Sequence, residues 1–547
     1  MPVNSVASSP AALLHRFMAW WCIEELKPRW VKPILLAIAG CYFAFLAVKQ
    51  TGPLVRYAHD VFILLDGAWR IYNGQVPYRD FYLALGPLEY SVTAAAMFLT
   101  GGAPSAIALG NVAFGIAFGV WGWFLSRRRM SMLPSLVAAG WLVLTATSPT
   151  PIGVPATDLS CAMSYNRHGY ALLGILLIEC AFLDRRSKFA GGVSSGVLLA
   201  LLAFLKLNFF GCGCVLILAS IAFVRRDSFS RIWGIVLGFV CASLPFLIFL
   251  RFSLAPYFAD LRTATHARIH VLNGVDAFNQ IMGSGDVVIL TIATIVTISL
   301  ASERSLRWAT MVSFLALWSL VVVSCAMLSQ SDAAEGKVFV LLPLWAILLL
   351  GKLSAVYPDS QEKSSVSLVA LMCIGSLFVC FFQDAASILT LVRYSLPPLR
   401  ASGFHLAHPG MGRLRFFETG AQEKNEADRL STAQYLSASV NQGVALLDKY
   451  AQPSETILTL GFTNPFPYIE RRRPAIGGSP WLSVTNNLPT TNLPDPLRIF
   501  GNADLIMLPT CHKGDPPLHA AYKPYLLEHF SYVASATCWS LYRRAER

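Results

Sequence analysis

Ionisable side chains are concentrated in one short stretch of this apolar chain, the segment VRYAHDVFILLDGAWRIYNGQVPYRDFYLALGPLEY at residues 55–90. Its carboxylates and cations are Arg56, His59, Asp60, Asp66, Arg70, Arg79, Asp80 and Glu89. The stretch directly follows a long apolar run, and charge at a membrane boundary is costly unless it is hydrated, paired or used. Residues 55–90 are therefore the strongest candidate for a catalytic segment.

Asp60 stands at the start of a stretch with helical spacing. One face of residues 61–72 carries Val61, Leu64, Leu65, Ala68 and Tyr72. This period predicts a helix that lies along the bilayer surface, with Asp60 at its start. Asp is also a favoured helix N-cap residue, so a purely structural capping role stays open beside a chemical one. Asp66 need not share a face with Asp60, and Asp80 can pair simply with Arg79 or Arg70.

Composition assigns the chain to the membrane proteins. Of its 547 residues 55% are hydrophobic and only 14% charged, and the mean hydropathy is +0.54. Soluble proteins carry about a quarter charged residues, so this chain has too few charges to cover a surface that faces water. A disordered chain and a coiled coil are excluded as well. The 12 cysteines are scattered mostly through apolar runs, a pattern of neither a disulfide scaffold nor a zinc ribbon. Cys511 and Cys538 can form a disulfide or remain two thiols.

A helix that crosses the bilayer needs roughly 20 mostly apolar residues. Eleven segments come close to or exceed this length: 33–49, 104–125, 131–147, 169–184, 189–206, 208–224, 232–250, 286–302, 309–328, 338–356 and 366–383. A twelfth run at 87–101 is shorter, begins with Gly86-Pro87 and carries Glu89. The prediction is an α-helical polytopic membrane protein with about 11 transmembrane helices.

Lys and Arg in short loops set the orientation of such a protein. Five basic loops fall on one side only if 87–101 does not cross completely; they are 127–129, 185–188, 225–226, 304–307 and 352–363. We therefore predict a cytoplasmic N-terminus, and residues 87–101 as interfacial, re-entrant or the bent start of the next helix. The predicted cytoplasmic segments hold 17 Lys and Arg against 7 Asp and Glu. Most of the net charge of +12 is thus a topology signal, and no nucleic-acid partner is needed to explain it.

The residue pattern of the C-terminal region differs from that of the rest of the chain. After residue 384, one amphipathic helical pattern is followed by the short β-rich runs ETILTLGF, ADLIMLP and SYVASATCWSLYR. We predict two domains: a multi-span domain at 1–384, whose first outer loop is 50–103, and a small extracytoplasmic α/β domain at 385–547.

The first-loop pattern resembles a known superfamily. An acidic residue just beyond the first span, then AWRIYNGQVPYRDF, then GPLEY, is similar to the first loop of the GT-C membrane glycosyltransferases, most closely the protein O-mannosyltransferase and aminoarabinose-transferase type. Only residues 56–90 carry this resemblance at motif level. It implies a GT-C-like fold that takes a sugar from a polyprenyl phosphate, on the outer face of the bacterial inner membrane or in the ER lumen. Many members place a second acid after the first, whereas Val61 follows Asp60 here, which weakens a paired-acid or metal-binding role.

The implied reaction suits a single carboxylate. Displacement at the anomeric carbon expels a phosphate, which leaves without a strong general acid, so one base on the acceptor hydroxyl suffices. Asp60 is the candidate base. Asp80, next to Arg79, is a candidate partner or acceptor for a sugar hydroxyl. The departing phosphate also needs fixed positive charge around it.

Other predicted outer loops supply that positive charge. The candidates are Arg167 and His168 in SYNRHGY, Lys206 between two spans, and Arg262 and His266 in the loop 251–285. Each has a simpler alternative: interfacial anchoring for the first pair, snorkelling for Lys206, and binding of lipid headgroups for the last pair.

Cofactor signals are weak. His266 and His270 have the spacing of two ligands on one helix face, but without a third ligand a metal site is not indicated, although a divalent cation is possible. No phosphate-binding glycine motif, nucleophile elbow or zinc-protease motif occurs. Three functions are compatible with these residues: a glycosyltransferase that uses a polyprenyl-phosphate sugar and an unidentified acceptor, a surface-polysaccharide polymerase or ligase that relies on Arg262 and Arg268, and a transporter or flippase of lipid-linked sugars. Charges gathered at the outer boundary disfavour the flippase.

Overall fold

The computed structural model describes most of the chain with side chains. The described residues are Trp21, 30–152, 154–181, 188–223, 228–269, 340–356, 364–397, 403–412, 414–417, 433–484, 486–511 and 516–545. Two of the predicted spans, 286–302 and 309–328, lie outside them.

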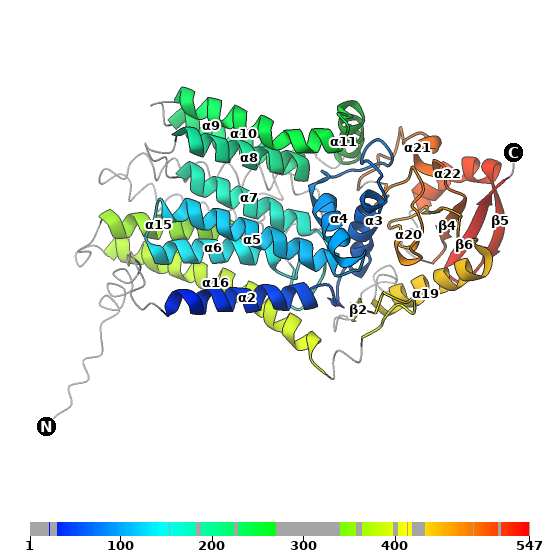
Figure 1. Cartoon of the computed structure of the whole chain (residues 1–547), viewed down its shortest axis with the longest axis horizontal. Coiled ribbons are helices and arrows are strands. Elements are labelled where there is room, and N and C mark those ends of the chain that lie inside the picture. The colour runs from blue at the N-terminus through cyan, green and yellow to red at the C-terminus, as the bar shows by residue number, and fades with distance from the viewer. Residues whose placement is uncertain are drawn as a thin grey trace.

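Long apolar helices run side by side and form most of the structure (Figure 1). They are α2 (Val31–Lys49), α5 (Ala106–Arg127), α6 (Met132–Thr147), α7 (Ser164–Ala181), α8 (Lys188–Leu205), α9 (Leu207–Phe223), α10 (Ser228–Phe249), α15 (Leu342–Val356) and α16 (Ser364–Ser395). Among the described residues, five helices are long and apolar enough to cross a membrane: Val31–Lys49, Ala106–Arg127, Lys188–Leu205, Phe229–Phe249 and Ala370–Ser395. The helical membrane fold is thus confirmed in outline, and the count of about 11 spans stays a prediction.

Two short helices lie between the ends of this bundle and the C-terminal elements (Figure 1). A 3₁₀ turn, Ala58–Asp60, leads into α3 (Val61–Tyr72), and α4 (Leu88–Thr100) packs against α3. With 13 residues, α4 is shorter than the roughly 20 that a span requires.

The structure corrects the prediction for α3. Nine of its 12 residues are buried, including Asp66 and Arg70, so the helix does not lie along a surface with one wet face. The reason is that residues 464–477, far along the chain, supply hydrogen bonds to its polar side chains.

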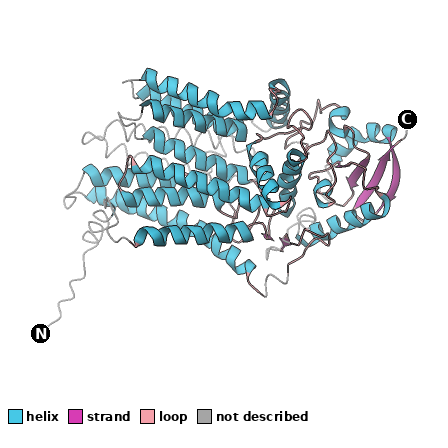
Figure 2. Ribbon diagram, in the orientation of Figure 1, coloured by secondary structure: helices cyan, strands magenta, loops and turns pink. Residues whose placement is uncertain are grey.

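The C-terminal elements form a four-stranded mixed sheet with helices around it, at the end away from the bundle (Figure 2). The strand order is β3-β4-β6-β5, and only the β3–β4 pair is parallel. The strands are β3 (Ile457–Thr459), β4 (Leu505–Pro509), β5 (Phe530–Ser535) and β6 (Trp539–Arg544), and the helices are α19 (Ala433–Tyr450), α20 (Phe466–Ile469), α21 (Pro496–Phe500) and α22 (Pro516–His529). β3 and β4 fall within the first two β-rich runs that the sequence indicates, and β5 and β6 share the third, each extending one residue beyond it.

A second, two-stranded sheet joins the first loop to the segment after α16. In it β1 (Pro53–Leu54) pairs with β2 (Arg415–Phe416). The start of the first loop is therefore paired with a segment about 360 positions later in the chain.

Candidate active site

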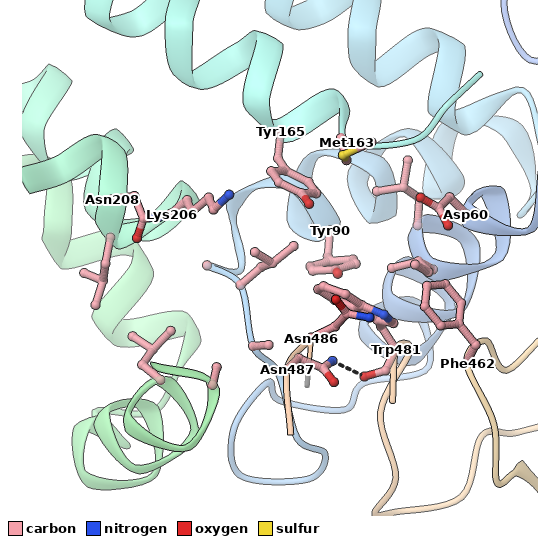
Figure 3. Close-up of a pocket in the computed structure, with 18 of the residues that line it drawn as sticks. Asp60, Tyr90, Met163, Tyr165, Lys206, Asn208, Phe462, Trp481, Asn486 and Asn487 are labelled. Atoms are coloured by element: carbon pink, nitrogen blue, oxygen red, sulfur yellow. Dashed lines mark hydrogen bonds between the residues drawn. The ribbon is translucent and has the colours of Figure 1, made fainter. Parts of the chain in front are cut away.

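A cavity of about 230 Å³ lies where the first loop, the bundle and the C-terminal region meet. The first loop contributes Asp60 and Tyr90, the start of α7 contributes Tyr165, and the break between α8 and α9 contributes Lys206 (Figure 3). The helix α11 (Leu254–Ile269) adds small and apolar side chains, and the segment 462–487 closes the cavity from the C-terminal side. The cavity thus holds a carboxylate and a primary amine among aromatic and amide side chains.

Asp60 is available for chemistry in this cavity. It precedes α3, but its side chain makes no capping hydrogen bond to the helix. Its Oδ1 lies 3.0 Å from Nε2 of His59, and 16% of its side chain is exposed. The capping role that the sequence left open is therefore absent from this structure, and the carboxylate faces the cavity instead.

The backbone beside Asp60 is strained. Tyr57 and Met163, which both line the cavity, have φ of 48° and 54°. Residues other than glycine rarely adopt this left-handed backbone conformation. Such strain is typical of functional sites that the surrounding structure holds in place.

Lys206 lies at the break between α8 and α9, opposite Asp60 in the cavity (Figure 3). Its Nζ donates to Oδ1 of Asn166 at 3.2 Å and lies 5.1 Å from the ring centre of Tyr165. The first loop passes tightly over this break, because the N–H of Gly86 donates to the carbonyl of Leu205 and a Cβ at Gly86 would clash with the backbone of Phe204. The lysine is therefore held at a fixed place, with its charge directed into a lined space rather than snorkelling to open surface.

Sequence reasoning missed the C-terminal wall of the cavity. Phe462, Trp481, Asn486 and Asn487 line it from a segment about 400 positions after Asp60. The only signal in the sequence was the turn pattern around Gly477-Gly478, which places an aromatic residue, Trp481, shortly after a sharp bend.

Arg167 and His168 do not line the cavity. Arg167 is buried and lies 3.5 Å from Oδ1 of Asp384, and it also donates to backbone carbonyls. His168 is buried too, with Nδ1 2.7 Å from Oε2 of Glu89. The structure therefore places both inside the bundle, in paired positions, rather than at the membrane border.

Arg79 and Asp80 also lie outside the cavity lining. The Arg79 guanidinium donates to both carboxylate oxygens of Asp80 at 2.7 Å, and the N–H of Val76 donates at the same distance. Burial alone would raise the pKa of Asp80, but these donors outweigh it and hold that pKa below its ordinary value. In this structure Asp80 stabilises the turn that leads to Phe81.

Arg262 and His266 are exposed on α11, although Leu261, Ala264 and Thr265 of the same helix line the cavity. The ring of His266 lies 2.8 Å from the carbonyl of Arg262. His270 lies outside the described residues.

Within the described parts of the chain, no group of three His, Cys, Asp or Glu side chains is placed to hold a metal ion. Cys511 and Cys538 are both thiols in this structure and form no disulfide with each other.

An ion pair fastens α11 to the C-terminal region. Nη2 of Arg498 donates to both oxygens of Asp260 at 2.8 and 2.9 Å, and the N–H of Leu83 donates to the same carboxylate. Arg498 also donates to the carbonyl of Tyr78. One guanidinium thus joins three walls of the cavity: the first loop, α11 and the C-terminal segment.

This ion pair is expected to make stability depend on pH. Burial raises the pKa of Asp260 from 3.8 to about 6, although Arg498 acts in the opposite direction. A raised pKa means that the folded state favours the protonated acid. The stabilisation that protonated Asp260 gives to the folded state is therefore fully present below pH 4 and is lost as pH rises through 6. Between pH 4 and pH 7 the loss should be about 2 to 3 kcal/mol. Asp260→Asn should remove this part of the slope in thermal unfolding, and an identical slope in both proteins would contradict the prediction.

Comparisons with known proteins give a likeness of overall structure. No protein-family model matches the chain, and no curated protein matches it. It is similar to the crystal structure of ArnT from Cupriavidus metallidurans in the apo state, with 11% identity and a TM-score of 0.43 over 94% of this chain and 97% of that one. It is also similar to ArnT bound to undecaprenyl phosphate, with 12% identity and a TM-score of 0.41 over 94% and 98%.

Proposed function

We propose that the chain is a membrane glycosyltransferase that transfers a sugar from a polyprenyl-phosphate-linked donor to a lipid, glycan or protein acceptor, with Asp60 as the general base. The observation that supports this most directly is that Asp60 and Lys206, far apart in sequence, line one cavity. A base and a fixed cation on opposite sides of one cavity are what transfer from a sugar phosphate requires.

The reaction follows from these two groups. The Asp60 carboxylate takes the proton of the acceptor hydroxyl as its oxygen bonds to the anomeric carbon. The bond from that carbon to the phosphate oxygen breaks, and polyprenyl phosphate leaves with the electron pair. The Lys206 ammonium stabilises the charge that develops on the phosphate. One displacement of this kind inverts the anomeric configuration.

The proposed location is the outer face of a bacterial inner membrane, with the N-terminus cytoplasmic and residues 385–547 periplasmic. The placement of α5 supports this orientation. The turn before it, at Gly102, accepts hydrogen bonds from Tyr468 and Arg471 of the C-terminal region. Arg127 and Arg129 follow at the other end of this 22-residue helix. Basic residues at the end opposite the cavity agree with a cytoplasmic position.

The polymerase or ligase alternative rests on Arg262 and Arg268. Because Arg262 is exposed and outside the cavity lining, we expect that the double variant Arg262→Ala/Arg268→Ala keeps most of the transfer activity. Loss of activity in this variant with Asp60 intact would favour the alternative.

Lys206→Met is expected to weaken donor use by about tenfold or more, because it removes a charge-assisted contact to phosphate and keeps an unbranched apolar side chain in place of the lysine stem. Lys206→Arg should retain part of the activity, since it keeps a cation. The measurement is transfer of radiolabelled sugar from an undecaprenyl-phosphate donor to a membrane extract, by full-length protein in nanodiscs.

A matched control is Lys449→Met, which changes an exposed lysine of α19 and should leave transfer unchanged. If wild-type protein transfers no label from any polyprenyl-phosphate sugar, the proposed function is wrong. If Lys206→Met transfers label at the wild-type rate, Lys206 does not contribute to donor use.

A further inference from the structure

Trp481 is held firmly at the cavity wall although it lies in a loop. Its carbonyl accepts from Oγ of Ser479 at 2.8 Å and from Nδ2 of Asn487 at 2.6 Å, and its N–H donates to Ser479. The hydroxyl of Tyr82 donates to the carbonyl of Asn487 at 2.6 Å. The first loop and this C-terminal turn therefore fix the backbone that carries the indole.

Among the residues that the structure describes, the indole N–H of Trp481 has no acceptor. Nε1 is buried and meets no hydrogen-bond partner among the described residues. A buried donor without an acceptor costs about 1 to 3 kcal/mol, and tryptophan usually finds a partner when its ring is buried. The same ring lines the cavity beside Tyr90 and Asn486 (Figure 3). A donor on a cavity-lining ring that has no acceptor among the described residues points to a ligand oxygen.

Aromatic contacts connect this indole to the proposed base. Trp481 lies edge-on to Phe462, with 6.1 Å between ring centres, and Phe462 lies edge-on to His59 at 4.9 Å. Nε2 of His59 lies 3.0 Å from the Asp60 carboxylate. The rings of Phe462 and His59 thus connect the indole to Asp60, and Trp481 and Asp60 line the same cavity.

Formal charge in the described cavity lining is limited to Asp60 and Lys206, apart from His59, which contacts Asp60. The other polar side chains are hydroxyls and amides; the amides are Asn208, Asn486 and Asn487. An amino sugar buried here would need a carboxylate besides the base, and a uronic acid would need a cation besides the one assigned to phosphate. The described lining offers neither.

We propose, on the basis of the proposed function, that the donor carries a neutral sugar, one hydroxyl of which accepts a hydrogen bond from the indole N–H of Trp481. The edge of the indole supplies this donor, and amide groups bind the other hydroxyls. Trp481 is then a substrate-binding residue that the C-terminal region contributes to the membrane domain.

The test compares lipids that differ only in the sugar. Full-length protein in nanodiscs is titrated with undecaprenyl phosphate, and with the same lipid carrying mannose, 4-amino-4-deoxyarabinose or galacturonic acid. Binding is measured by native mass spectrometry. The variants are Trp481→Leu, which removes ring and donor, and Trp481→Phe, which keeps a ring and removes the donor. The matched control is Trp539→Phe, because the Trp539 N–H donates to the carbonyl of Ser439 inside the C-terminal domain, away from the cavity.

Wild-type protein should bind the mannosyl lipid about tenfold more tightly than undecaprenyl phosphate. Trp481→Leu should abolish this advantage and Trp481→Phe should reduce it about threefold, with binding of undecaprenyl phosphate itself and the unfolding temperature unchanged. Trp539→Phe should keep the advantage.

An unchanged advantage in Trp481→Leu, or tighter binding of either charged sugar lipid, overturns the inference while the proposed function stands. If wild-type protein binds none of the four lipids, the proposed function fails together with it.

Discussion

Asp60→Asn is expected to lower sugar transfer by about 100-fold to 10,000-fold, the usual contribution of a general base. The amide has nearly the shape of the carboxylate but cannot accept the proton of the acceptor hydroxyl. Because the Asp60 side chain makes no capping hydrogen bond to α3, the substitution should leave the helix and the unfolding temperature unchanged. Donor binding should also persist, since Lys206 and Trp481 remain in place. The expected result is therefore a fall in kcat with little change in KM for the donor.

The matched control for this variant is Asp448→Asn, which removes an exposed carboxylate from α19 and should be fully active. Transfer by Asp60→Asn at the wild-type rate would show that another group takes the proton. A loss of activity accompanied by a lower unfolding temperature would mean that Asp60 serves the fold instead. Comparing rates with unfolding temperatures in both variants separates these outcomes.

Hydropathy predicted the helices of the bundle well because a membrane-spanning helix has an unambiguous signal. The first predicted span, 33–49, agrees within two residues with α2, Val31–Lys49. The β-rich runs predicted the four strands for a similar reason, since β-branched and aromatic residues recur there. Asp60 was recognisable because it stands where an apolar run ends and a helical period begins.

Positions that depend on distant partners were not predictable in this way. Arg167 looked like a border residue because Asp384, its partner, lies 217 positions away. For Trp481 the nearby turn at Gly477-Gly478 was not enough to predict a site, because the position of this residue depends on Tyr82 and on the turn at Asn487. Periodicity reports which face of a helix is apolar, but it does not report what covers the polar face.

Arg70 is the clearest case of such a covered polar side chain, and its loss is expected to destabilise the protein strongly. The guanidinium is fully buried, with Nε 2.8 Å from the Asp66 carboxylate. Nη1 donates to the carbonyls of Ala475 and Gly477 at 3.1 and 2.8 Å. Asp66 in turn accepts from Asn464 at 3.1 Å. This network fastens α3 to the C-terminal segment a few residues before Trp481.

Arg70→Met should therefore lower the free energy of unfolding by about 3 to 5 kcal/mol, because it leaves Asp66 as a buried charge without its partner. The double variant Asp66→Asn/Arg70→Met should be less destabilised than the two single changes together, since the uncompensated charge is gone. Thermal unfolding of detergent-purified protein, followed by circular dichroism, measures both quantities. Arg473→Met, which changes an exposed arginine of the same segment, should be neutral.

The activity of Arg70→Met distinguishes this network from the catalytic groups. Trp481 and Asn487 follow directly after the turn that Arg70 holds, so loosening it should displace one wall of the cavity and reduce transfer along with stability. Asp60→Asn should reduce transfer alone. If Arg70→Met unfolds at the wild-type temperature, the buried pair does not hold the two regions together. If it is destabilised but binds the mannosyl lipid as tightly as wild type, the Trp481 wall is positioned by Tyr82 and Asp260 without help from α3.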